Sequence, residues 1–447
     1  MNYKRVEFTF PIRKIGFSEE EIELVKTSDL RCKNSNNIVR LGSSIKSGGE
    51  GEIYTVYVNN HEDDSIVAKI YTSLDSLFTL TERKINYIVD NHWENKNVCW
   101  PIDTLYFNNK FVGFIMPKVN GKEIYSLTGN ENRIKRNYSD YDRLKQVEIV
   151  LKILSIFKDL HEHNIIVGDV KLENIMFDVK NDYDITLIDI DSVQIDQFPC
   201  VTTTIGYDSP DVMMFYGRKN ALDTNDDGEF SFIKFYKEFY RNVENDLYSL
   251  AVIIYRLVMF GAFPYCYEDV GLEVDVDDEN IEKVKLCIEQ SFGFNPNNDI
   301  KYSNEYRRAL WSYLPAFLKD TFFKVFKEHK IIPIEHWIKC FKKYKEILEN
   351  HSNNDENFYM IVPSEIAKYD SVNYKLTIVG HKLGFTFKQT FGKICAELKN
   401  KELYLTLYSD NKYVRKLIKD KEIKIDNYQF KLIYNIGILK KIEYIEN

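Results

Sequence analysis

Apolar and polar residues follow two different rhythms along this chain. β-type residues alternate with polar ones over 38–68, and a second strand-like run covers 111–116. The segments 74–89 and 141–161 instead place apolar residues at helical spacing. The pattern predicts strands, one helix, more strands and then a mainly helical region.

The start and the polar interruptions of this region carry further signals. A strand is predicted at 6–10, and Ser18 followed by Glu21 matches the capping box that starts a helix. The polar stretches 217–230 and 268–280 are predicted to be surface loops.

A separate C-terminal domain is predicted. A helix over 333–349 ends at the polar segment 350–355, which has the composition of a linker. Beyond it, strand-like runs alternate with turn signals, at 374–378, 403–407, 422–425 and 430–434. We expect a small β-rich or α+β domain over 356–447, which either recognises a partner or supports the rest of the chain.

Composition narrows the class of protein. The 447 residues carry a net charge of −8, which disfavours a nucleic-acid partner, and 44% hydrophobic residues can fill the cores of two or three domains. The seven cysteines form no CxxC pair, as in proteins of a reducing compartment. The start of the chain does not resemble a secretion signal, and the apolar segment 249–263 is too short to cross a membrane. We expect a soluble cytoplasmic protein with no membrane partner.

One short run carries the clearest chemistry. Asp169, Lys171 and Asn174 follow a predicted helix at fixed short spacing, and Asp189 closes the apolar run 185–188. A phosphoryl-transfer site needs a carboxylate to orient a hydroxyl, a cation for the charge that develops on phosphate, and oxygen ligands for magnesium. If the run 169–174 or the run that ends at Asp189 is taken alone, the alternative is a loop with ordinary surface acids.

A glycine cluster and a lysine upstream add to this chemistry. Gly48, Gly49 and Gly51 lie between two strand-like runs, where backbone N–H groups can approach a phosphate chain; the alternative is a tight turn. Lys69 lies within an apolar strand, so its amine must meet an anion or reach solvent. Glu82, central in the next helix, is the candidate partner of Lys69, and a surface glutamate is the alternative.

In this order, the motifs resemble those of the eukaryotic-like Ser/Thr protein kinase superfamily. The resemblance covers about 38–350 and implies an α+β, bilobal fold. Its β-rich N-lobe would span about 38–116 and its mainly helical C-lobe about 121–350, after an N-terminal extension over 1–37.

The resemblance also implies roles for individual residues. Asp169 would orient the substrate hydroxyl, and Lys171 would lie beside the transferred phosphoryl group. Asn174 and Asp189 would hold Mg²⁺, or Mn²⁺ in its place, and Lys69 would bind the α and β phosphates of ATP.

The nucleotide site implied by the resemblance extends to a hinge. Met116 would be the gatekeeper; Pro117 has no N–H but its carbonyl can accept from adenine, and Val119 can donate its N–H. The predicted ATP-binding residues are Gly48, Gly49, Gly51, Ile53, Lys69, Glu82, Met116, Pro117 and Val119.

The segment 204–211 resembles the end of an activation segment, which builds a peptide platform in protein kinases. The resemblance places Thr204 near the catalytic aspartate and favours Thr202 and Thr203 as autophosphorylation positions. Asp246, at the start of a segment that resembles the large buried helix, would anchor the catalytic-loop backbone.

Two departures from the family pattern bear on regulation and on the metal. Gly168 stands where the family has an arginine that receives an activation-loop phosphate, so we expect no switching by that pairing. Asp191 replaces the glycine of the magnesium motif, where it would stiffen the loop, add an oxygen near the metal or point into solvent. The resulting Asp-x-Asp-Ser element and Trp337 resemble a bacterial branch of these kinases linked to stress-response genes, which suggests partners such as a phosphatase.

The sequence predicts an ATP- and Mg²⁺-dependent Ser/Thr protein kinase, because no polar group essential to phosphoryl transfer is absent. Two alternatives stay open. One is a pseudokinase, a nucleotide-binding scaffold or sensor that acts through its C-terminal domain. The other is a kinase for a small molecule.

Overall fold

The computed structural model describes most of the chain up to Asn350 and the strands of the C-terminal region. The described residues are 18–48, 51–72, 78–91, 95–129, 131–200, 202, 204, 206–213, 241–264, 292, 311, 314–350 and the strands between 367 and 446. The predicted strand at 6–10, the predicted loops at 217–230 and 268–280, and all but the first residue of the predicted linker lie outside the described residues.

The chain divides into two compact units. Residues 1–125 together with 155–249 form the first unit, and residues 126–154 together with 250–447 form the second. The described residues contain both helices and strands, as expected for an α+β protein. The boundaries of the two units differ from those of the predicted lobes, about 38–116 and 121–350, so the lobes stay a prediction.

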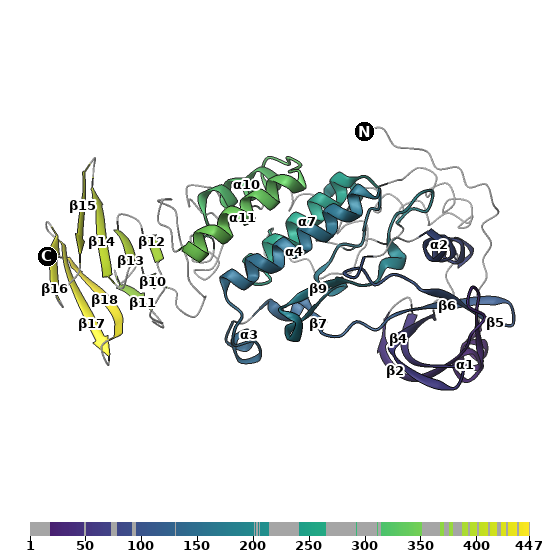
Figure 1. Cartoon of the computed structure of the whole chain (residues 1–447). Helices are drawn as coiled ribbons and strands as arrows, with labels where there is room; N and C mark the ends of the chain where they lie inside the picture. The colour runs from purple at the N-terminus through teal and green to yellow at the C-terminus, as the bar shows by residue number, and fades with distance from the viewer. Residues whose placement is uncertain are drawn as a thin grey trace. The chain divides into compact units, whose positions relative to one another are not determined.

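A closed barrel dominates the first unit, with strand order β1-β2-β3-β4-β6-β5 (Figure 1). Its strands are β1 (Leu30–Cys32), β2 (Ile38–Ser47), β3 (Gly51–Val58), β4 (His61–Tyr71), β5 (Asp103–Phe107) and β6 (Lys110–Pro117). The strands predicted over 38–68 and 111–116 are confirmed. Because β1 pairs with both β2 and β5, the end of the predicted N-terminal extension is built into this sheet.

Two tight turns set the register of the barrel. Asn59–Asn60 joins β3 to β4, Asn108–Asn109 joins β5 to β6, and all four residues have positive φ, between 48° and 67°. Two-residue hairpin loops require such angles, which asparagine tolerates better than most residues. The register places Lys69 of β4 between Ile53 of β3 and Phe114 of β6, well inside the sheet.

Two helices accompany the barrel. The capping box predicted at α1 (Glu19–Thr27) is confirmed, because the Ser18 hydroxyl accepts from the Glu21 N–H at 3.1 Å and the Glu21 carboxylate from the Ser18 N–H at 3.0 Å. The helix predicted over 74–89 is α2 (Phe78–Asn91).

A small antiparallel sheet and several short turns carry the catalytic loop. The sheet has the order β7 (Lys122–Glu123), β8 (Ile175–Asp178), β9 (Asp184–Leu187). The 3-10 turns are η1 (Ile124–Leu127), η2 (Leu172–Asn174), η3 (Val179–Asn181) and η4 (Ile190–Ser192). Turn η2 leads directly into β8 and β9 leads to η4, so this sheet sets the spacing between the two predicted metal-binding segments.

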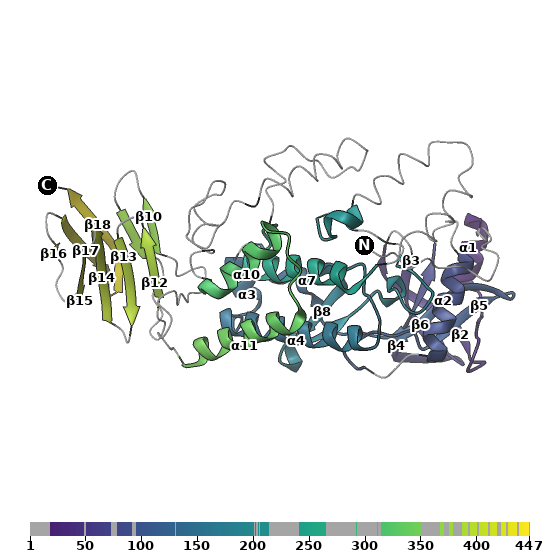
Figure 2. The same cartoon turned by 90° about the horizontal axis from the view of Figure 1, so that it is seen from above.

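The second unit has an aromatic helical core. Its helices are α3 (Glu131–Asn137), α10 (Ala316–Phe326) and α11 (Ile334–Asn350), while α4 (Arg143–Glu162) and α7 (Val243–Val258) run through both units. Tyr255 of α7 makes edge contacts with Phe322 and Phe326 of α10, and Phe322 contacts Trp337 of α11. Figure 2 shows α7, α10 and α11 side by side.

The helices predicted over 141–161 and 333–349 are confirmed as α4 and α11. The apolar segment 249–263 contributes the end of α7, whose residues from Leu250 to Tyr255 are all fully buried. A helix that is apolar on every side in this way belongs to a protein core. Within the described residues, no helix is long and apolar enough to cross a membrane.

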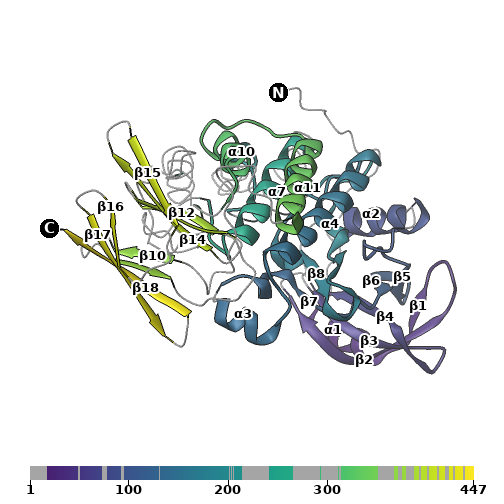
Figure 3. The ribbon, with the colours of Figure 1, turned by 60° about the vertical axis from the view of Figure 1, so that its left-hand side comes forward.

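The C-terminal strands form two antiparallel sheets (Figure 3). One has the order β10-β11-β18-β17-β16 and the other β12-β13-β14-β15. The strands are β10 (Ala367–Asp370), β11 (Lys375–Ile378), β12 (Phe387–Phe391), β13 (Ile394–Lys399), β14 (Glu402–Ser409), β15 (Lys412–Leu417), β16 (Glu422–Ile425), β17 (Tyr428–Asn435) and β18 (Ile438–Glu446). The four predicted runs are confirmed as β11, β14, β16 and β17, while an independent domain over 356–447 stays a prediction.

Candidate active site

Lys69 is buried within the barrel wall. It belongs to a run at the end of β4, residues 67–71, in which every residue is buried. Gly113 on β6 permits this packing, because a Cβ at that position would lie 1.9 Å from the carbonyl oxygen of Lys69. Only 8% of the lysine side chain is exposed, so its ammonium group requires anionic partners within the protein.

Two carboxylates from one loop supply that charge. The Lys69 amine donates to Asp189 at 2.6 Å and to both oxygens of Asp191 at 2.9 and 2.8 Å. Burial lowers the pKa of Lys69, but the charges of Asp191 and Asp189 more than offset this effect, and the pKa lies above its ordinary value. The prediction that Glu82 is the partner is wrong. The Glu82 carboxylate accepts from the Tyr106 hydroxyl at 2.9 Å instead, because α2 directs this acid toward β5.

Asp191 is the more enclosed of the two acids. Its side chain is 4% exposed, against 41% for Asp189, and it also accepts from the Tyr71 hydroxyl at 2.6 Å. Burial raises the pKa of Asp191, but the charge and hydrogen bonds of Lys69 together with the Tyr71 bond outweigh it, and the pKa falls below its ordinary value. Burial and the Asp191 charge raise the pKa of Asp189, which Lys69 offsets only in part. Of the three alternatives for Asp191, the one in which it points into solvent is wrong.

The catalytic loop surrounds Asp169 with donors. Lys171 donates to one carboxylate oxygen at 2.7 Å, and the amide of Asn174 donates to the same oxygen at 3.0 Å. The other oxygen accepts from the Thr204 hydroxyl at 2.6 Å, so the predicted contact of Thr204 with this aspartate is confirmed. Asn174 reaches back because turn η2 reverses the chain, and its amide also donates to the Asp169 carbonyl at 3.0 Å. The predicted residues of the run 169–174 therefore meet at one carboxylate.

Asp246 holds the backbone of this loop. Its carboxylate accepts from the N–H groups of Val167 at 2.7 Å and Gly168 at 2.9 Å, which confirms the predicted anchoring role. His161 lies 3.0 Å from the same carboxylate. The contacts fix the peptide that precedes Asp169.

An arginine that the sequence motifs do not reveal occupies the space beside Gly168. The Arg241 guanidinium donates to the Gly168 carbonyl at 2.8 Å, to the Asp208 carboxylate at 2.7 Å and to the Thr202 carbonyl. Gly168 has φ +74°, and a Cβ there would lie 2.4 Å from the sulfur of Cys200. Arg241 thus links Gly168 of the catalytic loop to Thr202 and to the buried carboxylate of Asp208. No local motif signals this role, since Arg241 lies far from both segments in sequence.

A cavity of about 480 Å³ brings the predicted groups together, a size suited to a small ligand. The predicted residues that line it are Gly48, Gly51, Ile53, Lys69, Met116, Pro117, Val119, Asp169, Lys171, Asn174, Asp189 and Thr202. Gly49 and Thr203 lie outside the described residues, and Glu82 does not line the cavity. Cys99, which the sequence did not single out, also lines it, and burial raises the pKa of its thiol to about 12.

The oxygen groups at this cavity fit a magnesium ion that binds together with a phosphate. The amide nitrogen of Asn174 is used in bonds to Asp169, which leaves the amide oxygen as an acceptor, and Asp189 contributes a partly exposed carboxylate. Mg²⁺ is commonly held by one or two such groups plus phosphate oxygens and water. Among the described residues, no group of three or more His, Cys, Asp or Glu side chains could hold a metal ion.

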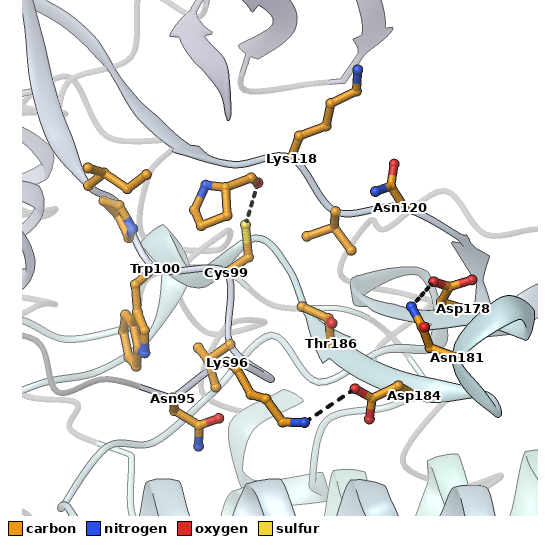
Figure 4. Close-up of a pocket in the computed structure, with 15 residues that line it drawn as sticks. Asn95, Lys96, Cys99, Trp100, Lys118, Asn120, Asp178, Asn181, Asp184 and Thr186 are labelled. Atoms are coloured by element: carbon orange, nitrogen blue, oxygen red, sulfur yellow. Dashed lines mark hydrogen bonds and ion pairs between the residues drawn. The ribbon is translucent and has the colours of Figure 1, made fainter. Parts of the chain in front are cut away.

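A second cavity, of about 730 Å³, adjoins the hinge segment (Figure 4). Cys99, Pro117 and Val119 line both cavities. Two of its charged lining residues form an ion pair, Lys96–Asp184 at 3.8 Å. None of the predicted catalytic or metal-binding residues lines it.

Known proteins similar to this chain include protein kinases. No family model matches the chain. A curated relative from Escherichia coli strain K12, named protein kinase YegI, is 26% identical over 317 residues, which are 68% of this chain and 44% of the relative. Its counterpart of the same name from Escherichia coli O157:H7 is 28% identical over 268 residues, 57% of this chain and 37% of the relative. The chain therefore spans less than half the length of these relatives.

Two solved structures were also found. The autoinhibited serine kinase domain of the giant muscle protein titin is 14% identical, with a TM-score of 0.46 and coverage of 69% of this chain and 81% of that domain. The Cydia pomonella granulovirus kinase PK-1 is 15% identical, with a TM-score of 0.45 and coverage of 72% and 96%. The named curated relatives confirm the resemblance of the chain to the protein kinase superfamily.

Proposed function

We propose that this chain, a relative of the protein kinase superfamily, transfers the γ-phosphate of ATP to a Ser or Thr hydroxyl of a protein. The observation that carries the proposal is the convergence of Lys69, Asp169, Lys171, Asn174 and Asp189 on one cavity. Phosphoryl transfer needs little covalent chemistry from a protein and depends on positioned charges of this kind.

Each of these side chains has a distinct task in the proposed reaction. Asp169 orients the acceptor hydroxyl, and Lys171, which is 2.7 Å from it, balances the charge that develops on the transferred group. Lys69 holds the α and β phosphates, and Asn174 and Asp189 hold magnesium. The bound ion supplies charge neutralisation for the phosphate oxygens.

A protein acceptor is supported by the segment 204–208. The Thr204 N–H donates to the Asp208 carboxylate at 2.9 Å, and the Asp208 N–H donates to the Thr204 carbonyl at 3.2 Å. Thr204 also donates its hydroxyl to Asp169 at 2.6 Å, so in this proposal a peptide acceptor would lie beside Thr204 and Asp208. We include in the proposal a bilobal arrangement of the predicted N-lobe and C-lobe, with the nucleotide at the cavity described above.

Radiolabelled ATP tests the activity. The purified chain with Mg²⁺ is expected to label itself or a generic protein, and the label should be lost on chelation. Asp169→Asn removes the carboxylate with little change in shape, and it should lower the rate by about 10²-fold or more, as expected for a group that handles the transferred proton. Asp320→Asn, at a half-exposed ion pair of α10, is the matched control and should keep the wild-type rate.

The same experiment separates the alternatives. Tight Mg²⁺-dependent ATP binding without turnover, unchanged in Asp169→Asn, would identify a nucleotide-binding scaffold or sensor. Phosphorylation of a small molecule, with no labelled protein, would identify a small-molecule kinase. Loss of labelling in Asp320→Asn as well would show that the assay reports folding and not chemistry.

A further inference from the structure

Lys69 of β4 is held by the loop that contains Asp189 and Asp191. Lys69 and Tyr71 are two residues apart on β4, so their side chains lie on the same face of the strand. Both donate to Asp191, which is therefore held from one side by an ammonium group and a hydroxyl. With 4% of its side chain exposed, Asp191 has little contact with water.

Helix α2 presents the opposite charge to this site. The carboxylate of Glu82 is bonded to Tyr106, whereas Lys84 is buried and donates to the Pro199 carbonyl at 3.3 Å. The positive charge of Lys84 also acts on Asp191, in the direction that stabilises its ionised form. The helix therefore contributes a cation where the resemblance predicted an anion, and the loop contributes the anion.

We infer that Asp191 is the positioning residue of Lys69 and, with Tyr71, takes the role predicted for Glu82. The inference rests on the proposed function for its catalytic consequence. Its structural part, which carboxylate holds Lys69, stands on the contacts alone.

Asp189 and Asp191, the two partners of Lys69, differ in whether they can break their contact with its amine. Asp189 is 41% exposed and is able to turn toward a cation, while Asp191 is enclosed and bonded to Tyr71 as well. A buried ammonium group that loses its last carboxylate has a large desolvation cost. Asp191 removes this cost by staying with Lys69, so that Asp189 is free for magnesium. Without Asp191, Lys69 would retain Asp189 as its remaining carboxylate and compete with the metal.

Acylation of lysines in the chain without nucleotide tests which carboxylate holds Lys69. Brief treatment with acetic anhydride, followed by mass spectrometry, gives the rate at each lysine, and the surface lysines serve as internal controls. Asp191 accepts two of the three hydrogen bonds that the Lys69 amine donates among the described residues. Asp191→Asn should therefore weaken the hold on this amine and raise its acylation rate about tenfold or more relative to the other lysines.

Matched variants make the result decisive. Glu82→Gln removes the predicted partner and should leave the Lys69 rate at the wild-type value. Tyr71→Phe removes one hydroxyl and should raise the rate less than Asp191→Asn does; it also serves if Asp191→Asn does not fold. An unchanged Lys69 rate in both Asp191→Asn and Tyr71→Phe, or an increase in Glu82→Gln as large as that in Asp191→Asn, would overturn the inference.

Steady-state kinetics then test the catalytic part separately. Asp191→Asn should lower kcat about tenfold or more and raise the Mg²⁺ concentration needed for half-maximal rate, while Glu82→Gln changes neither. A merely structural defect would lower the folded fraction without changing the Mg²⁺ requirement. If the wild-type chain transfers no phosphate but the acylation pattern holds, the proposed function fails and the assignment of Asp191 stands. If the chain is active and Asp191→Asn keeps the wild-type kcat and Mg²⁺ requirement, the positioning role is refuted.

Discussion

Asp169 and Asp191 are both buried carboxylates, yet their hydrogen-bond donors come from different parts of the chain. Asp169 receives donors from its own loop, Lys171 and Asn174, and from Thr204. Asp191 receives its donors from β4, more than a hundred residues earlier in the chain. The comparison teaches that short spacing within one loop supplies two of the donors to Asp169, whereas the donors to Asp191 are brought to it only by long-range packing.

The largest expected effect comes from removing the ammonium group of Lys69 from its buried pair with Asp191. Lys69→Met should abolish phosphate transfer and also lower the free energy of unfolding by about 3–5 kcal/mol, because Asp191 is left as a buried charge without its main partner. Urea unfolding and the labelling assay measure the two effects independently.

The double variant Lys69→Met with Asp191→Asn sharpens this result. It removes the buried pair together, so most of the lost stability should return while transfer stays absent. If the double variant is as unstable as Lys69→Met, Lys69 and Asp191 do not act as a coupled pair. The contrast between Asp191 and Asp169 would then be lost.

The next effect concerns Arg241, which contacts the loop that carries Asp169. Arg241 is 1% exposed and its partner Asp208 is 3% exposed, so Arg241→Met removes the cation of a buried ion pair and should cost about 3–5 kcal/mol in unfolding free energy. Transfer should fall as well, since the segment 202–208 loses its link to the catalytic loop. Arg40→Met is the matched control, because its ion pair with Asp29 is half-exposed and should contribute less than about 1 kcal/mol. Equal losses in the two variants would show that Arg241 has no special role.

The contrast also explains what the sequence could predict. The barrel strands, α4 and α11 follow from apolar spacing, and the cluster at Asp169 follows from short spacing within one loop. Local patterns cannot supply the partner of Lys69, because α2 fixes which of its faces meets the site only through packing. Arg241 was missed for the same reason, and its contact with Gly168 spans 73 residues. The assignment to Glu82 was wrong because it rested on the central position of this residue in the predicted helix, whereas packing directs its carboxylate to Tyr106.

A smaller effect is expected at Gly168. Alanine there must adopt φ +74° and place its Cβ 2.4 Å from the Cys200 sulfur, so the variant combines backbone strain with a clash. Gly129 has φ +91°, but the nearest atom to an added Cβ is the end of the Arg133 side chain at 3.5 Å. Gly129→Ala should therefore cost about 1–2 kcal/mol from backbone strain alone, and Gly168→Ala should cost more. Thermal unfolding of the two variants checks the difference; equal shifts would mean that the packing against Cys200 relaxes freely.

The smallest effect tests whether Asp169 keeps its function when one of its several hydrogen-bond donors is removed. Thr204→Val replaces the hydroxyl that donates at 2.6 Å with a methyl group, while Lys171 and Asn174 still donate to the carboxylate. The loss of one hydrogen bond among several corresponds to about 1 kcal/mol, or a roughly fivefold lower kcat/KM. Thr204→Ser keeps the hydroxyl and should retain the wild-type value. A loss in Thr204→Val as large as that in Asp169→Asn would show that Asp169 depends on a single donor.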